Sequence, residues 1–114
     1  MAKRAPTVVE SFWMGFVASI GCVVCRRFEP TGLPPEVHHV AEGSGPRNNF
    51  AVACLCGSRT DGGHHRGAIG FHGMGSDAFC RLFRPPGDSE FGLIVWTIED
   101  IAAVLRKRFG SVLF

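Results

Sequence analysis

Cysteines and histidines gather into one ordered stretch of this chain, and their order constrains the fold more than any other feature. The members of the series, from the N-terminal side, are Cys22, Cys25, His38, His39, Cys56, His64, His65 and His72. The two residues between Cys22 and Cys25 give the spacing at which both thiolates reach one tetrahedral zinc ion. A structural zinc takes four ligands, and the series offers twice that number. Two metal centres and one free histidine base would use them all.

Length and composition predict a single small domain over residues 1–114, with a core that a structural metal would stabilise. The chain has 5 cysteines, an odd count, and its first four residues do not resemble a signal peptide. We therefore expect a cytoplasmic protein whose thiols bind metal instead of forming disulfides. The longest apolar run, residues 12–25, is too short and too interrupted to span a membrane.

The formal net charge of +2 does not by itself indicate a nucleic-acid-binding protein. Arginines nevertheless lie among the metal motifs, and a guanidinium group can hold a phosphate by two hydrogen bonds. Arg26, Arg47 and Arg66 are the candidate phosphate contacts. The alternative is that they are solvated arginines of surface loops.

The sequence predicts an α+β fold with helices at both ends. Thr7 and Glu10 form a capping-box pattern, which predicts a helix over 8–20 that stops at Gly21. This helix is apolar almost all round, so it is either deeply buried or has a second apolar partner, and a homodimer is one expectation. The other predicted elements are a hairpin of strands 37–40 and 50–55 around a turn at 43–46, a glycine-rich stretch at 57–75, a helix at 77–83, a short strand at 93–96 and a last helix from 97 to about 109.

Cys22 and Cys25 are the strongest predicted ligands of a structural zinc. Cys56 follows on the second hairpin strand, and His64 would complete a Cys3His site after a loop. Cys54 competes with His64, because it lies two residues from Cys56 and so on the same strand face. We favour His64, since two ligands on a flat strand hold one tetrahedral ion poorly. Cys80 lies among apolar helix residues and is expected to be a buried, inert thiol.

The remaining histidines suit hydrolysis of a phosphodiester. His38 and His39 are adjacent, so on an ideal strand they point to opposite faces. At a strand end, one can face a metal ion while its neighbour faces a water molecule beside it. The cation would polarise the phosphate while a neutral imidazole takes the proton of the attacking water.

The order C-x2-C, HHV, LC, HH and GAIGFH resembles that of the HNH nucleases of the ββα-metal fold. Within that group it is most similar to the phage recombination-enhancement (Ref-type) RecA-dependent nucleases. The stretches that carry the resemblance begin at Ile20, His38 and Gly67, and the similarity covers about residues 17–83.

The resemblance implies a zinc-stapled ββα-metal core over about residues 20–84 and a helical extension over about 91–114. It implies a structural zinc on Cys22, Cys25, Cys56 and His64, with the roles of His64 and His65 exchangeable. It implies a catalytic Mg²⁺ or Mn²⁺ on His38, His65 and His72, with Zn²⁺ or Ni²⁺ as other occupants. His39 would be the general base, and Asn49 or Asn48 would hold the hairpin loop and the base in place.

The function expected from this resemblance is a phage or prophage DNA endonuclease in a bacterial cytoplasm. Its partners would be DNA and a RecA-type filament. Two alternatives stay open at this point. One is a catalytically inactive, zinc-stabilised module that binds a host or recombination protein, and the other is a zinc protein that binds DNA without cutting it.

Overall fold

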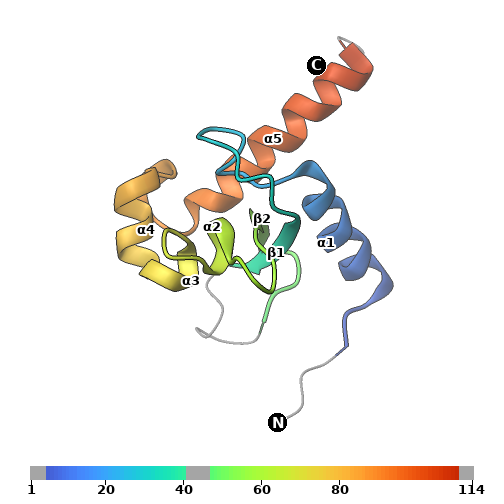
Figure 1. Ribbon diagram of the computed structural model, residues 1–114. Helices are drawn as coiled ribbons and strands as arrows, with labels where there is room; N and C mark the ends of the chain where they lie inside the picture. The colour runs from blue at the N-terminus through green and yellow to red at the C-terminus, as the bar shows by residue number, and fades with distance from the viewer. Residues whose placement is uncertain (1–4, 41–46, 111–114) are drawn as a thin grey trace.

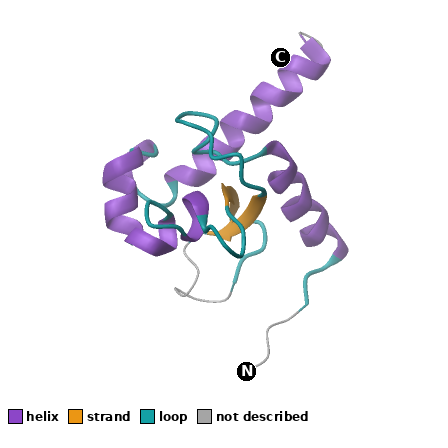
Figure 2. Ribbon diagram, viewed as in Figure 1, coloured by secondary structure: helices purple, strands orange, loops and turns teal. Residues whose placement is uncertain are grey.

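The computed structural model describes residues 5–40 and 47–110, and over these ranges the chain folds as α+β (Figure 1; Figure 2). The elements in chain order are α1 (Val8–Ile20), β1 (Pro35–His39), β2 (Val52–Cys56), α2 (Gly63–Arg66), α3 (Phe71–Met74), α4 (Ser76–Phe83), a 3-10 turn (Pro86–Asp88) and α5 (Gly92–Phe109). The turn predicted at 43–46 lies outside the described residues. The two hairpin strands and the N-terminal helix are as predicted, within two residues of their boundaries, whereas the C-terminal helix starts earlier than predicted.

Helix α1 begins at the predicted capping box. The Thr7 hydroxyl accepts a hydrogen bond from the Glu10 amide at 3.1 Å, and the Glu10 carboxylate accepts one from the Thr7 amide at 2.8 Å. These two bonds satisfy amide groups that the first helical turn leaves unpaired. The helix ends at Gly21, whose φ of 98° is open to glycine at little cost.

The two strands pair antiparallel, with Val37 opposite Cys54 and His39 opposite Val52. Helix α1 covers one face of this small sheet, where Val17 packs with Val52 and Cys54 (Figure 1). The Trp13 indole also donates a hydrogen bond to the Phe50 carbonyl at 3.0 Å, which ties α1 to the start of β2.

The main core lies on the other face of the sheet. Its fully buried members come from the turn after α1, from β2, from α4 and from α5, and they include Val23, Val24, Ala53, Leu55, Phe79 and Leu93. Side chains of β2 thus alternate between the α1 face and the main core, as the period of a strand requires. All five residues of β2 are buried.

The strand predicted at 93–96 is wrong, because these residues form the first turn of α5. The last helix therefore begins at Gly92 and not at Thr97. Leu93, Trp96, Thr97 and Asp100 are buried, and their spacing is that of one helix face. A run of four apolar residues fits a buried strand or a buried helix equally well, and here packing against the core decides for the helix.

An ion-pair cluster fixes α5 to the turn after α1. The Arg27 guanidinium lies 2.9 Å from the buried Asp100 carboxylate and 3.1 Å from Glu99, and its carbon lies 4.7 Å from the centre of the Trp96 ring. Beyond this cluster the C-terminal half of α5 projects from the body of the molecule (Figure 1). Among the described residues, no helix has both the length and the apolar character needed to cross a membrane.

Candidate metal centres

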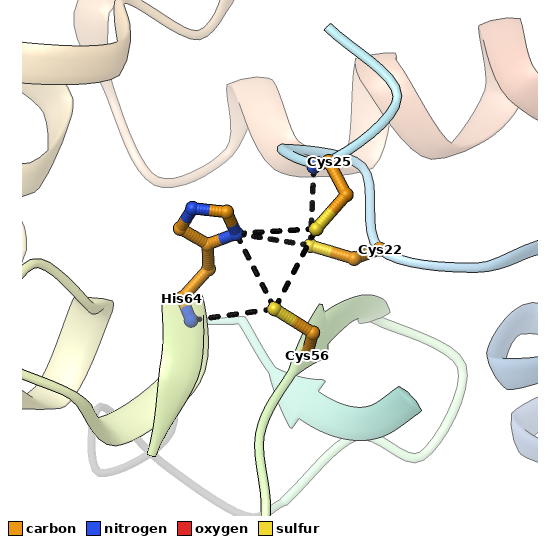
Figure 3. A group of neighbouring side chains, drawn as sticks. All are labelled: Cys22, Cys25, Cys56 and His64. Atoms are coloured by element: carbon orange, nitrogen blue, oxygen red, sulfur yellow. Dashed lines mark hydrogen bonds between the residues drawn. The ribbon is translucent and has the colours of Figure 1, made fainter. Parts of the chain in front are cut away.

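Four predicted ligands meet at one point, although they come from three separate segments (Figure 3). Cys22 and Cys25 lie in the turn after α1, Cys56 ends β2, and His64 lies in α2. Their thiol sulfurs and one imidazole nitrogen all lie within 4.8 Å of one another. The turn is docked onto the sheet by the Val23 amide, which donates to the Cys54 carbonyl at 3.0 Å.

The spacing of these atoms fits a tetrahedral zinc ion. Bond lengths of about 2.3 Å to sulfur and 2.0 Å to nitrogen give tetrahedron edges of about 3.8 Å between sulfurs and about 3.5 Å between sulfur and nitrogen. His64 Nδ1 lies 3.6, 3.4 and 3.3 Å from the sulfurs of Cys22, Cys25 and Cys56. The Cys25 and Cys56 sulfurs are 3.6 Å apart. The donor set of three thiols and one imidazole is also that of a closed structural site.

Further hydrogen bonds are directed at the sulfurs. The Cys25 amide lies 3.4 Å from the Cys22 sulfur, and the His64 amide lies 3.5 Å from the Cys56 sulfur (Figure 3). The Thr31 hydroxyl lies 3.0 Å from the Cys56 sulfur as well. Such groups stabilise thiolate charge, so the surroundings of the cluster favour the ligating form of each cysteine.

The surroundings shift the pKa values of Cys22, Cys25 and His64 in different directions. Burial raises the pKa of the Cys22 thiol. Burial also acts to raise the pKa of Cys25, but hydrogen bonds from Thr31 and the neighbouring thiols outweigh it and lower that pKa below its usual value. Burial lowers the pKa of His64, which keeps its imidazole neutral near pH 7. A zinc ion would remove the remaining thiol protons on binding.

The competition between Cys54 and His64 is settled by where the side chains lie. Cys54 packs on the α1 face of the sheet, and its sulfur lies 3.8 Å from the Ala18 carbonyl. The expectation that Cys54 and Cys56 share a strand face is therefore wrong, because Cys56 at the strand end turns toward the main core. Burial raises the pKa of Cys54 to about 12, as suits an inert thiol. Cys80 is buried among core residues, as predicted.

Two glycines allow α2 and α3 to bring their histidines to the sheet. Gly63 begins α2 with a φ of 54°, and a Cβ there would lie 2.6 Å from the Cys56 carbonyl oxygen. A Cβ at Gly73 in α3 would overlap the carbonyl of Gly67. These close backbone approaches explain why the stretch needs glycine at these positions.

A second cluster joins three more of the predicted ligands. His38 of β1, His65 of α2 and His72 of α3 each offer a ring nitrogen within 4.8 Å of the other two. Their ring centres are 5.3, 5.3 and 5.0 Å apart. Three imidazoles bound to one ion at about 2.0 Å, with tetrahedral angles, would have ring centres about 5 Å apart. His38 and His65 are buried and His72 is exposed, so the cluster opens to solvent on one side.

Two carboxylates that sequence reasoning missed contact this second cluster. Glu36 Oε1 lies 2.9 Å from His65 Nδ1, and Glu90 Oε2 lies 3.1 Å from His38 Nε2. Burial lowers the pKa of His65, the charges of Arg66 and His72 add to that effect, and Glu36 opposes it. Glu36 had a weak signal in the sequence, since it lies two residues before His38. Glu90 had none, because it is 52 positions from the histidine it contacts.

His39 lies apart from both clusters. Its Nε2 is 2.9 Å from the side-chain oxygen of Asn49, which is buried just before β2. Of the two asparagines weighed from the sequence, Asn49 is thus the one that holds this histidine. Asn48 instead accepts a hydrogen bond from the Phe50 amide at 2.9 Å and shapes the turn.

The three predicted phosphate contacts have different surroundings. Arg66 is exposed, and it follows His65 directly in α2. Arg47 is exposed as well. Arg26 lies 3.5 Å from the Asp100 carboxylate and donates to the Ile20 carbonyl at 3.4 Å, so part of its charge is offset within the protein.

Comparison with known proteins adds no relative to this picture: no protein-family model matches the chain, and no curated protein or solved structure is significantly similar to it.

Proposed function

We propose that this protein is a phage or prophage metal-dependent DNA endonuclease of the HNH type, acting in the cytoplasm of a bacterial host. The observation that carries the proposal is that two adjacent residues, His38 and His39, have different contacts. His38 belongs to a cluster that can hold an ion, whereas its neighbour His39 is held by Asn49 outside that cluster. Metal-assisted hydrolysis of a phosphodiester uses a cation to stabilise charge and, in this proposal, a separate base to take the proton of the attacking water.

The roles of the residues follow from their contacts. The Cys3His cluster serves as a structural zinc site, because it joins three segments around a closed donor set. His38, His65 and His72 hold the second ion, Mg²⁺ or Mn²⁺ during turnover, which supplies charge stabilisation to the phosphate. Imidazole ligands also favour Zn²⁺ or Ni²⁺, so either ion is expected there after purification.

His39 acts as the general base in this proposal. When its Nε2–H donates to Asn49, the lone pair of the neutral ring is on Nδ1, which can take a proton from water. Asn49 thereby fixes both the orientation and the tautomer of the base. Arg66 is the principal phosphate contact, with Arg47 and Arg26 as further ones, and the DNA partner is presented alone or on a RecA-type filament.

Incubation of the purified protein with supercoiled plasmid tests the proposal directly. Nicked or linear products should form with Mg²⁺ or Mn²⁺ and should be absent when EDTA is present. Cleavage that requires excess Zn²⁺ and fails with Mg²⁺ would contradict the assignment of the working metal. If no added metal ion supports cleavage, the endonuclease proposal fails.

The exposed face of α1 favours one alternative from a different class. Val8 and Phe12 lie one turn apart with 87% and 71% of their surface exposed, which is the kind of apolar surface that protein partners cover. A zinc-stabilised module that binds a host or recombination protein would need only the first cluster. Elemental analysis separates the two functions, since one ion per chain favours the module and two favour the enzyme. A zinc protein that binds DNA without cutting it would show salt-dependent binding and no cleavage.

A further inference from the structure

We infer that Glu36 and Glu90 are positioning residues of the three-histidine site, and that they present opposite ring nitrogens of two ligands to the ion. His65 would bind through Nε2 and His38 through Nδ1. The inference rests on the second metal site of the proposed function and adds the residues that orient its ligands.

The His65 side of the inference follows from one short contact. Glu36 Oε1 is 2.9 Å from His65 Nδ1, and His65 is only 4% exposed. An imidazole that binds an ion is neutral, and with Glu36 Oε1 against Nδ1 its single N–H is on the nitrogen that faces the carboxylate. The lone pair is therefore on Nε2, at the far side of the ring. Histidine ligands of metal ions commonly donate their other ring N–H to a carboxylate in this way.

The same reasoning gives the opposite result for His38. Here Glu90 Oε2 faces Nε2 at 3.1 Å, and the His38 side chain is 1% exposed. A neutral ring that donates from Nε2 has its lone pair on Nδ1. The Phe71 ring, with its centre 4.3 Å from that of His38, limits how far the imidazole can turn. The site thus has one histidine that binds through Nε2, His65, and one that binds through Nδ1, His38.

Glu90 lies outside the segment of about residues 20–84 that the sequence predicted as the metal core. It lies just before α5. The Arg27–Asp100 pair and the burial of Leu93 hold the start of α5 against the core. The segment that leads into α5 therefore contributes to the second site, through the carboxylate of Glu90.

The test uses full-length protein prepared with one zinc per chain, at the Cys3His cluster, and its first readout needs no second ion. Long-range proton–nitrogen NMR spectra of the imidazoles should show His65 as the Nδ1–H tautomer and His38 as the Nε2–H tautomer. Glu36→Ala should convert His65 to a mixture and leave His38 unchanged, and Glu90→Ala should do the reverse. Glu36→Gln and Glu90→Gln keep an oxygen acceptor, so they should keep the tautomer.

The second readout is the affinity of the three-histidine site for cobalt(II), followed by its visible absorption. Each alanine variant should bind cobalt about 10- to 100-fold more weakly than wild type, the usual effect of losing an outer partner of a metal ligand. Each glutamine variant should fall between, and zinc content should stay unchanged throughout. Glu29→Gln, at an exposed position, is the matched control and should behave as wild type.

The two possible failures are distinguishable. Wild-type protein that holds only one zinc per chain and takes up no cobalt would overturn the second metal site, and the proposed function with it. Wild-type protein that binds cobalt, with alanine variants of unchanged tautomer and affinity, would overturn the positioning role alone. Identical tautomers for His38 and His65 in wild type would also overturn it.

Discussion

His38 and His39 are neighbours in the chain, yet they contact different groups, and this difference makes the general base testable by itself. His39→Ala should keep the fold, both metal ions and DNA binding, because the side chain belongs to neither cluster. Only plasmid cleavage should slow, by about a hundred- to ten-thousandfold, the usual contribution of a general base. A nicking assay beside elemental analysis measures both effects.

His38→Ala is the matched comparison. It should lose the second ion together with activity, while the zinc of the Cys3His cluster remains. A His39→Ala protein that loses an ion, beside a His38→Ala protein that keeps it, would mean that the two roles are exchanged. Unimpaired nicking by both variants would remove the support for the nuclease proposal.

Cys54 and Cys56 provide a second pair at the residue scale, since both are buried thiols of β2 but only Cys56 faces the metal cluster. Cys56→Ala should abolish zinc binding. Cys54→Ala should keep one structural zinc per chain and lower the free energy of unfolding by about 1 kcal/mol, through lost packing against α1. Zinc analysis and urea unfolding check this, and loss of zinc from the Cys54 variant would contradict the ligand assignment.

The sequence predicted which cysteines and histidines gather into the two clusters better than it predicted the groups around them. Ligands such as Cys22 and Cys25 follow a spacing that coordination geometry imposes on the chain itself. Glu90 follows no such local rule, because only the packing of α5 brings it to His38. Residues that act through another side chain are set by the tertiary structure, and for this reason spacing alone did not reveal them.

At the scale of elements, α1 was predictable and α5 was not fully so. The capping box of α1 is a local signal, and the helix begins where that signal places it. The start of α5 has no side-chain cap, and its first turn is apolar, so only burial against the core determines its conformation. The short helices α2 and α3 lie in what was predicted only as a glycine-rich stretch, because they depend on close backbone contacts between residues far apart in that stretch.

Because the Arg27–Asp100 ion pair attaches α5 to the turn after α1, breaking this pair should lower the stability of the protein. Arg27→Met should lower the free energy of unfolding by about 2 kcal/mol, because it leaves the buried Asp100 carboxylate with only the longer Arg26 contact. Urea denaturation of the zinc-loaded protein measures the change. Arg108→Ala, at the exposed end of the same helix, should change it by less than about 0.5 kcal/mol. Equal effects of the two substitutions would show that the pair does not anchor the helix.

For the whole molecule, the core is small, so zinc bound at the Cys3His cluster would supply a large part of the stability. Removing it with a strong chelator should unfold the protein, because structural zinc sites in small domains supply on the order of 10 kcal/mol. Circular dichroism should show loss of helix on chelation and its return when zinc is restored. A metal-free protein with an unchanged melting temperature would contradict the structural role.

The exposed apolar face of α1 predicts self-association of the whole protein. A homodimer that covers Val8 and Phe12 should appear in sedimentation experiments and should dissociate on dilution. Phe12→Glu should give a monomer with unchanged zinc content, because the side chain is 71% exposed and supports no core contact. Wild-type protein that stays monomeric at all accessible concentrations would leave this face to another partner.

His64 and His65 are consecutive residues of α2, and each belongs to a different cluster. An ion at the Cys3His cluster fixes the position of this short helix, and the neighbouring histidine is then placed without further loss of conformational freedom. Loading should therefore be hierarchical: the second site fills only after the first, and emptying the second leaves the first intact. In a cell short of zinc, such a protein would lose its fold and its hydrolytic centre together. The concentration of available zinc would therefore control both.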